Sequence, residues 1–255
     1  MISKTFCIAR VIVLASFAFS SAAWAATCSN ASLRGTYGFL HGGTDSNGTP
    51  SSAAVTQITF DSTTGTFTGE TKASHDGVIT NFSFTGIYAI ASNCTGTGTP
   101  MGGSPFSIVV TSRGFLALHL FSEGFAAKRA SPTCTNAGLK GSFGFETTGV
   151  FLAGAPSIGA VAFIGELKLT VNPSGEGVIR GHIASSEDGK FLTLEEEPVA
   201  GSYRVGKDCS GSATITPKGH SEMHFNFVVV DDGKEMLAIE TDADTVVSGT
   251  LVKSN

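Results

Sequence analysis

The sequence is poor in charged residues and almost lacks tryptophan. Of its 255 residues only 15% are charged, one is Trp and three are Tyr. Acidic residues outnumber basic ones by 21 to 16, for a net charge of −5, so the basic surplus typical of nucleic-acid binders is missing. A hydrophobic content of 41% excludes a disordered chain, and the 32 glycines have no three-residue period, which excludes collagen.

Recognisable catalytic motifs are also missing. The sequence contains no G-x-S-x-G of a serine hydrolase, no phosphate-binding loop and no C-x-x-C spacing of a metal site. No window of 11 residues carries a convincing helical stripe of apolar side chains. We therefore expect no cofactor and no bound metal, and the sequence favours a binding protein over an enzyme while leaving that choice open.

The first 25 residues have the layout of a secretory signal peptide. Lys4 and Arg10 precede an apolar run at residues 11–19, which is too short to span a bilayer, and A-W-A at residues 23–25 offers a cleavage site. We expect the mature chain to begin near Ala26 and to be secreted or periplasmic. Cleavage would leave four of the five cysteines and a formal charge of −7.

The rest of the chain contains one unit twice. The segment TCSNASLRGTYGF at residues 27–39 reappears as TCTNAGLKGSFGF at residues 133–145, and further matches follow in the same order, including G-x-Y at residues 86–88 and 201–203. Ordered matches indicate a duplication. A period of more than about 100 residues indicates tandem domains, because solenoid repeats are shorter.

We place the two domains at residues 27–130 and 133–255. Each has one cysteine before its first expected strand and one in mid-domain. Four cysteines allow three pairings, and the duplication selects Cys28–Cys94 with Cys134–Cys209. Disulfides are common in small secreted domains, whose cores are modest.

Each domain contains eight strand-like runs separated by turn sequences. In the first domain they are residues 35–41, 53–60, 65–73, 79–91, 96–101, 106–111, 115–121 and 124–128. In the second they are residues 141–147, 159–171, 177–185, 191–205, 212–217, 223–230, 236–241 and 245–252. This order predicts an all-β protein of two tandem eight-stranded antiparallel up-and-down β-barrels, which leave no exposed sheet edge.

Two other all-β architectures are alternatives. A pair of β-sandwiches is the first, although immunoglobulin-type sandwiches usually carry a Trp between their cysteines and the mature chain has none. A transmembrane barrel is the second, but only Tyr37, Tyr88 and Tyr203 could contribute to the aromatic girdles that it needs.

The duplicated units, with G-T-Y-G-F at residues 35–39 and G-x-Y at residues 86–88 and 201–203, resemble a known group of domains. These are the allene-oxide-cyclase-like barrels of uncharacterised bacterial secreted proteins, related to allene oxide cyclases and dirigent proteins. The resemblance covers both copies and implies a barrel that binds an apolar substrate inside. The catalytic carboxylate of the cyclases has no counterpart here, so the resemblance does not imply their activity.

An eight-stranded barrel is either filled by side chains or holds one small ligand. Strand alternation puts Tyr37, Phe39 and His41 on one face, and Phe143 with Phe145 on the matching face of the second copy, which we interpret as the interiors. The candidate ligand-binding residues are Tyr37, Phe39, His41, Tyr88, Phe143, Phe145, Phe151 and Tyr203.

Several polar clusters fit a solvated surface better than a site. His220, Glu222 and His224 alternate along one strand and could hold a metal, but the opposite face of that strand is apolar and the trio is expected to face solvent. The three acids at residues 195–197 predict a solvated bulge, and the D-A-D at residues 242–244 lacks the rest of a calcium loop.

The connection after the first strand differs between the copies. It is polar at residues 42–50 and apolar at residues 149–158, and so large an apolar loop should be covered. We expect the neighbouring copy to cover it, with a ligand mouth or a partner surface as the alternative. Leu152→Asp should loosen the packing between the copies in the first case and abolish ligand uptake if the segment is a ligand mouth.

These observations lead to three hypotheses of function. The first is a secreted tandem barrel that binds a small apolar molecule, with no nucleic acid and no membrane span. The second is a cyclase- or isomerase-like enzyme, which would need one buried carboxylate. Glu146 and Glu166 are the candidates, although Glu146 has the opposite parity to Phe145, which argues against it. The third is a structural or adhesive surface protein with solid barrels.

Overall fold

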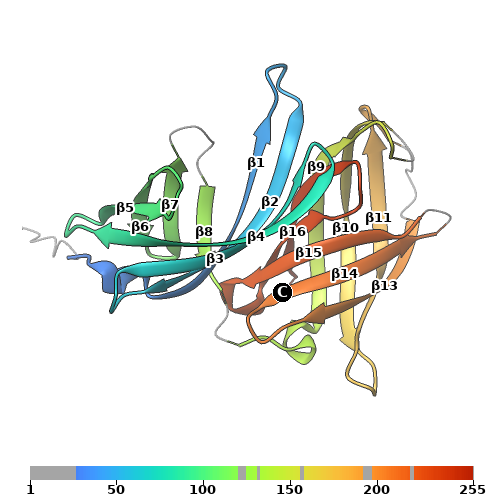
Figure 1. Cartoon of the computed structure of the whole chain (residues 1–255). Helices are drawn as coiled ribbons and strands as arrows, with labels where there is room; N and C mark the ends of the chain where they lie inside the picture. Colours follow the sequence, from blue (N-terminus) through green and yellow to red (C-terminus); the bar gives the residue numbers. More distant parts are fainter. Residues whose placement is uncertain are drawn as a thin grey trace, which may run out of the picture.

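The computed structural model of the protein describes residues 27–119, 125–130, 133–155, 158–191, 197–218 and 221–254. The expected signal peptide at residues 1–25 lies outside the described residues. The chain forms two all-β bodies that lie side by side (Figure 1).

The first body is a closed barrel of eight antiparallel strands in sequence order, preceded by the 3-10 turn η1 (Asn30–Leu33). Pairing of β1 with β8 closes the ring, with Tyr37 opposite Arg129 and Gly38 opposite Lys128. The strands are β1 (Gly35–Thr44), β2 (Pro50–Asp61), β3 (Thr66–His75), β4 (Val78–Ile90), β5 (Thr95–Pro100), β6 (Phe106–Thr111), β7 (Gly114–His119) and β8 (Phe125–Arg129).

The second body follows the turn η2 (Asn136–Leu139) and is also a closed ring of eight strands, because β9 pairs with β17 and each remaining member pairs with its neighbours. The ring members are β9 (Gly141–Phe151), β10 (Gly159–Val171), β11 (Gly177–Glu187), β13 (Glu197–Val205), β14 (Ser210–Pro217), β15 (Met223–Val230), β16 (Glu235–Glu240) and β17 (Thr245–Lys253). The short turn η3 (Asp231–Gly233) joins β15 to β16. The prediction of two tandem eight-stranded up-and-down barrels is confirmed.

One predicted strand of the second copy is wrong in its extent. Residues 191–205 do not form one strand, because Lys190–Phe191 (β12) folds back on the end of β11 as a short extra hairpin. Asp188 and Gly189, with φ of 48° and 73°, make the tight turn between them. Both central residues of this turn have positive φ, which suits the two-residue hairpins that match strand twist.

The first connection of each copy is also shorter than predicted. Pairing of β1 with β2 continues to Gly43 opposite Ser52, so much of residues 42–50 is strand. In the second copy Gly149–Phe151 belongs to β9 and pairs with β10 from Gly159 onward. The two strands stay paired because the uncharged residues at both ends of the turn can continue the ladder.

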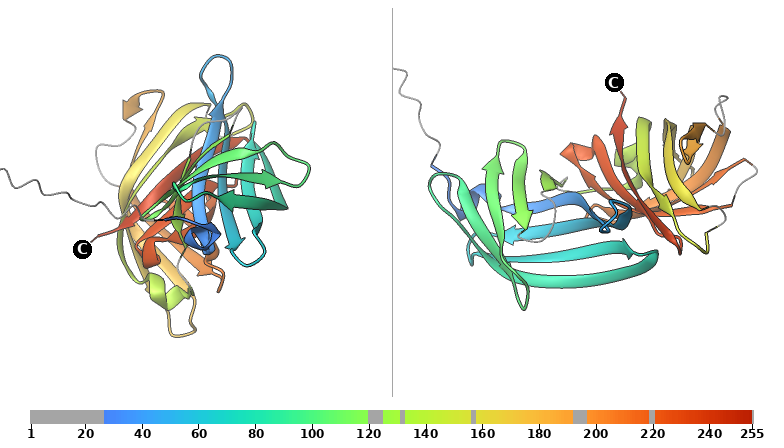
Figure 2. Two further views of the ribbon diagram at one scale, coloured as in Figure 1. Left: turned by 90° about the vertical axis from the view of Figure 1, so that its left-hand side faces the viewer. Right: turned by 90° about the horizontal axis from the view of Figure 1, so that it is seen from above.

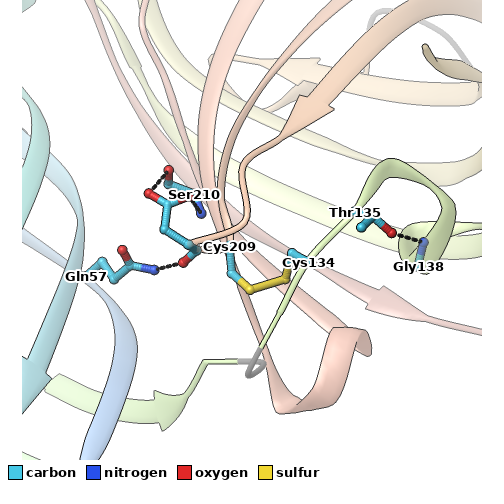
Figure 3. The surroundings of a disulfide bond; sticks show 7 residues. Gln57, Cys134, Thr135, Gly138, Cys209 and Ser210 are labelled. Carbon is cyan, nitrogen blue, oxygen red and sulfur yellow. Dashed lines mark hydrogen bonds between the residues drawn. A yellow bond between two sulfur atoms is a disulfide. The ribbon is translucent and has the colours of Figure 1, made fainter. Parts of the chain in front are cut away.

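The disulfides Cys28–Cys94 and Cys134–Cys209 join the pairs that the duplication predicts, with Cα–Cα distances of 4.9 Å and 5.0 Å. Each ties the segment before a 3-10 turn to a turn between two strands of its own barrel (Figure 3). Two disulfides in a protein of this size are typical of an extracellular or periplasmic protein.

The same end of each barrel is closed by one recurring arrangement. Tyr88 Oη donates to the Asn30 carbonyl at 3.1 Å, and Tyr203 Oη donates to the Asn136 carbonyl at 2.7 Å. The side-chain oxygens of Asn30 and Asn136 accept from the backbone N–H of the strand residue two positions after each tyrosine. A buried leucine of each turn, Leu33 or Leu139, packs into the core below.

The barrels share an apolar interface. Strands β1 to β4 have 10 to 13 residues whereas β5 to β8 have five or six, so the long strands extend past the closed ring along the second barrel (Figure 2). Ala53 and Val55 of β2 pack with Val228, Ile239 and other outward-facing aliphatic residues of the second barrel. Aliphatic contact therefore joins the two copies.

Leu152, in the apolar connection after β9, packs against this same interface cluster. The interface therefore covers Leu152 in part, whereas Ile158 of the same connection is 67% exposed, so the expectation of a covered segment holds only for part of it. Polar contacts border the interface: Gln57 donates to the Asp208 carbonyl (Figure 3), and Asp244 N donates to the Gly77 carbonyl at 2.9 Å. Gly77 must be glycine here, because its φ is +76° and a Cβ atom would meet the Asp244 Cα at 2.5 Å.

Candidate functional site

Aromatic rings pack together in the interior of the first barrel, as far as the structure describes it. Phe60 lies at the centre, with ring centroids of Tyr37, Tyr88 and Phe115 at 5.8 Å, 4.8 Å and 5.4 Å, all in edge-to-face contact. All four side chains are buried. Edge-to-face packing of this kind stabilises a core beyond simple area burial. Tyr37 and Tyr88, two of the candidate ligand residues, lie within this packed cluster.

Phe39 and His41 lie nearer the other end of the first barrel. Phe39 is buried, and its ring centroid is 5.7 Å from that of His41. Solvent reaches part of the His41 side chain, while its Nε2 makes a 3.3 Å hydrogen bond with Thr56 Oγ1, which in turn bonds Thr71 Oγ1 at 2.8 Å. Surrounding protein lowers the pKa of His41 by desolvation, which favours the neutral imidazole.

The second barrel contains an apolar cavity of about 50 Å³. Aliphatic and aromatic side chains form its wall, apart from the hydroxyl-bearing Thr147 and Tyr203. Of the candidate ligand residues, Phe145 and Tyr203 line this cavity, whereas Phe143 is fully buried in the same core. Phe151 packs against Phe163 with ring centroids 6.3 Å apart.

Strand register explains why the second barrel is less full than the first. Gly35 lies opposite Phe60 in the first barrel, and its counterpart Gly141 lies opposite Leu169 in the second. Following the ladders in the same way, Phe67 corresponds to Ile179 and Phe115 to Met236. Three rings of the first core are thus replaced by aliphatic side chains at equivalent positions, and Leu169, Ile179 and Met236 all line the cavity.

The unexpected member of this site is Glu240, the last residue of β16. It lies opposite Phe225 and two residues after Ala238, both of which line the cavity, so it belongs to the inner face of the barrel. Its side chain is only 2% exposed. Burial, aided by the negative charge of Asp242, raises the pKa of Glu240 to about 8, so its carboxyl is protonated at neutral pH.

Two buried polar atoms have no hydrogen-bond partner in the part of the chain that the structure describes. They are Glu240 Oε2 and Thr147 Oγ1. Buried polar groups are almost always satisfied in folded proteins, so each exception needs an explanation. Both of these belong to the wall of the second barrel.

The sequence-based choice of carboxylates was wrong. Glu146 and Glu166 are exposed, because they alternate with the inward-facing Phe145 and Leu167 and therefore point out of the barrel. The same alternation identifies Glu240: Met236, Ala238 and Glu240 share a face, and Met236 is an apolar core residue. A single acid in phase with the apolar residues of its strand was the signal that sequence analysis missed.

The polar cluster on β15 has a structural explanation. His224 Nδ1 lies 2.7 Å from Asp242 Oδ1, and His224 N donates to Asp242 Oδ2 at 2.8 Å, which joins the start of β15 to the end of β16. His224 Nε2 is 3.9 Å from Glu222, and His220 lies outside the described residues. Within the described ranges, no three His, Cys, Asp or Glu side chains lie where they could share a metal ion.

The remaining sequence candidates add no further site. Glu195 and Glu196 lie outside the described residues. Asp244 is at the interface between the barrels, where its backbone contacts Gly77. No helix among the described residues is long and apolar enough to cross a bilayer.

Comparisons with known proteins reveal no family. Neither the protein-family models nor the curated proteins include a match to this chain. Among solved structures, a DUF3598-family protein of unknown function from Nostoc punctiforme PCC 73102 is 10% identical, with a TM-score of 0.28. A porin-like protein from Bacteroides uniformis ATCC 8492 is 7% identical, with a TM-score of 0.21. In both cases the match covers 88% of this chain and 97% of the other.

Proposed function

We propose that this protein binds a small, predominantly apolar molecule inside its second barrel. The observation that carries the proposal is the apolar cavity of about 50 Å³ between Leu169, Ile179 and Met236, where the first barrel has three aromatic rings. Void space in a core costs stability, because the side chains around it lose packing contacts. A cavity in one copy, at positions where the other copy has aromatic rings, is therefore consistent with a ligand site.

The size of the cavity limits the ligand. An apolar cavity of about 150 Å³ is enough to bind benzene, so a third of that volume accommodates only a short hydrocarbon segment without movement of the wall. We therefore propose that the cavity holds the apolar end of a slender molecule that extends toward the end of the barrel where β9, β15 and β16 meet the loops.

The other features of the chain support this proposal. The motifs at residues 35–39, 86–88 and 201–203 resemble those of allene-oxide-cyclase-like barrels, and members of that wider group bind apolar substrates inside the barrel. The signal-like segment at residues 1–25 and the two disulfides are in keeping with a secreted or periplasmic binding protein. In this proposal the first barrel is the structural partner.

The proposal is tested by filling the cavity. Leu169→Phe restores the ring found at the equivalent position of the first barrel, and Ile164→Phe adds similar bulk on the exposed outer face of the same strand. Chemical shifts of the protein are recorded during titration with pentane and with xenon. We expect both probes to shift cavity resonances in the wild type and in Ile164→Phe, and neither in Leu169→Phe. Equal shifts in all three proteins, or none in any, would contradict the proposal.

Glu240 also favours a second candidate function, a cyclase- or isomerase-like reaction. Such an enzyme needs a carboxyl in an apolar site that stays protonated near neutral pH and can act as a general acid, and Glu240 meets that description. The test is turnover: an apolar substrate converted by the wild type should not be converted by Glu240→Gln, which keeps the shape but cannot donate a carboxylic proton.

A further inference from the structure

Glu240 and Thr147 lie in one sector of the second barrel. Thr147 of β9 is paired with Gly249 of β17, which is paired with Ala238 of β16, and Glu240 is the next inward residue along β16. Gly249 has no side chain to separate the two groups, and the Thr147 Cγ2 atom lies 2.6 Å from where a Cβ of Gly249 would be. Thr147 and Ala238 line the cavity, and Glu240 follows Ala238 on the same inner face of β16, at the end of the barrel where β16 meets its loop.

The two groups have unused hydrogen-bonding capacity. An unsatisfied polar group that is buried costs about 1–3 kcal/mol, and that cost disappears when a partner arrives. Other inward-facing polar groups of the molecule do have partners, such as Tyr203 Oη on the Asn136 carbonyl and Thr56 Oγ1 on Thr71 Oγ1. The absence of a partner for Glu240 Oε2 and Thr147 Oγ1 is thus particular to this place and points to a missing ligand.

The first barrel carries hydrogen-bonding residues at the same two register positions. Thr147 in β9 corresponds to His41 in β1. Thr147 lies two residues after Phe145, and His41 lies two residues after the matching Phe39. Glu240 lies opposite Phe225 as His119 lies opposite Phe106, so His119 holds the equivalent position in β7. Both copies therefore place polar residue types at this level of the ring, but the second copy combines them with an apolar cavity.

We propose that the Glu240 carboxyl and the Thr147 hydroxyl together bind the carbonyl or hydroxyl oxygen of a neutral ligand whose hydrocarbon part fills the cavity. This inference rests on the function proposed above and names the chemical class of its ligand. A protonated carboxyl donates to an oxygen acceptor, and the hydroxyl can either donate or accept. The class is a slender aliphatic ketone, aldehyde or alcohol.

A cationic ligand is the competing chemistry, since an ammonium could pair with an ionised Glu240. The surroundings argue against it: apart from Glu240 itself, the described residues that line the cavity carry no charge, and among them Thr147 and Tyr203 alone have a side-chain oxygen. A buried ammonium needs several acceptors to replace its hydration, and this wall does not supply them.

The experiment compares three probes of equal chain length, 2-pentanone, pentane and pentylamine, by titration at pH 6 and at pH 9. The variants are Glu240→Gln, which keeps a hydrogen-bond donor, Glu240→Leu, which removes it, and Thr147→Val. Glu146→Gln, on the exposed face next to Thr147, is the matched control.

We expect 2-pentanone to bind the wild type, Glu240→Gln and Glu146→Gln within about threefold of one another at pH 6. Glu240→Leu should weaken the ketone roughly tenfold, and Thr147→Val by a smaller factor, with no loss of pentane binding. At pH 9 the wild type should lose ketone affinity while Glu240→Gln does not. The difference in ketone affinity between the wild type and Glu240→Gln at pH 9 tests the role of the Glu240 carboxyl even if Glu240→Leu does not fold.

The outcomes separate the two proposals. If pentane and 2-pentanone bind equally and no Glu240 variant changes their ratio, the ligand class is wrong but the apolar site stands. If pentylamine binds most tightly, and more so at pH 9, an ionised Glu240 is the recognition group and this inference is overturned. If none of the probes binds any of the proteins, the function and the inference both fail.

Discussion

The two barrels have the same framework and different interiors. Both have eight strands in the same order, a disulfide to the segment before the first strand, and a tyrosine bonded to an asparagine carbonyl. Inside, the first is packed around Phe60, whereas the second has aliphatic residues, a cavity and a buried carboxyl at corresponding levels. The disulfide and the tyrosine–asparagine hydrogen bond are therefore retained in both copies, whereas the side chains inside the barrels have diverged.

This difference shows how a duplication can divide two requirements between copies. Interlocking rings stabilise a barrel, whereas a cavity and an unsatisfied carboxyl cost stability, which in our proposal is the cost of binding a ligand. Here the first barrel packs along β15, β16 and β17 through an apolar interface and so supports the wall that carries Glu240.

The largest effect that we predict is the pH dependence of the second barrel. Because the pKa of Glu240 is about 8 in the folded protein and 4.5 in an unperturbed glutamate, the folded state keeps a proton that the unfolded state releases. Stability should fall as pH rises from about 4.5 to about 8, by about 5 kcal/mol at most. Urea denaturation of the wild type and of Glu240→Gln at pH 5, 6.5 and 8 measures it.

In Glu240→Gln this contribution to the pH dependence should vanish, whereas Glu146→Gln, on the exposed face, should follow the wild type. Parallel curves for the wild type and Glu240→Gln would mean that Glu240 ionises freely in the folded state. A carboxyl held protonated inside the second barrel would then no longer distinguish it from the first.

The next effect concerns how the two cores are filled. Phe60→Leu removes the central ring of the first barrel, and we expect it to cost about 1–2 kcal/mol because the surrounding rings cannot close the void. Leu169→Phe, at the equivalent position, should change stability by less than about 1 kcal/mol because a cavity is already there to receive the ring. Calorimetric unfolding of both variants measures the asymmetry; equal costs for the two changes would show that the cores are equally full.

The sequence predicted the two barrels and their disulfides but not the cavity or the buried carboxyl of the second barrel. Period-two alternation, D-G and related turns and the repeated T-C-x-N-A segment predicted the barrels and both disulfides, since these depend on local chemistry and on the duplication. Whether a barrel is filled depends on which side chains lie opposite one another across several strands. Phe60 and Leu169 are both simply apolar in the sequence, and only the register shows that they are equivalent.

Glu240 shows a different limit. Strand membership alone does not tell inside from outside, and the alternation that argues against Glu146 can equally be applied to Glu240. Alternation relative to Met236 and Ala238 would have distinguished it. The extent of its pKa shift could not have been read in this way, because it depends on burial among residues from other strands.

The smallest effect that we predict is the contribution of the ion pair between the barrels. Lys128 Nζ of β8 lies 2.5 Å from Glu235 Oε2 of β16; the glutamate side chain is 10% exposed, but that of the lysine is 40% exposed, so solvent reaches the pair from the lysine side. Solvent screens such a pair, so a double-mutant cycle of Lys128→Met and Glu235→Gln should give a coupling energy below about 1 kcal/mol that declines with added salt. Apolar contact, by contrast, does not weaken with salt. A coupling energy well above that value would mean that electrostatics holds the barrels together, and a change inside one of them could then no longer be interpreted without considering the other.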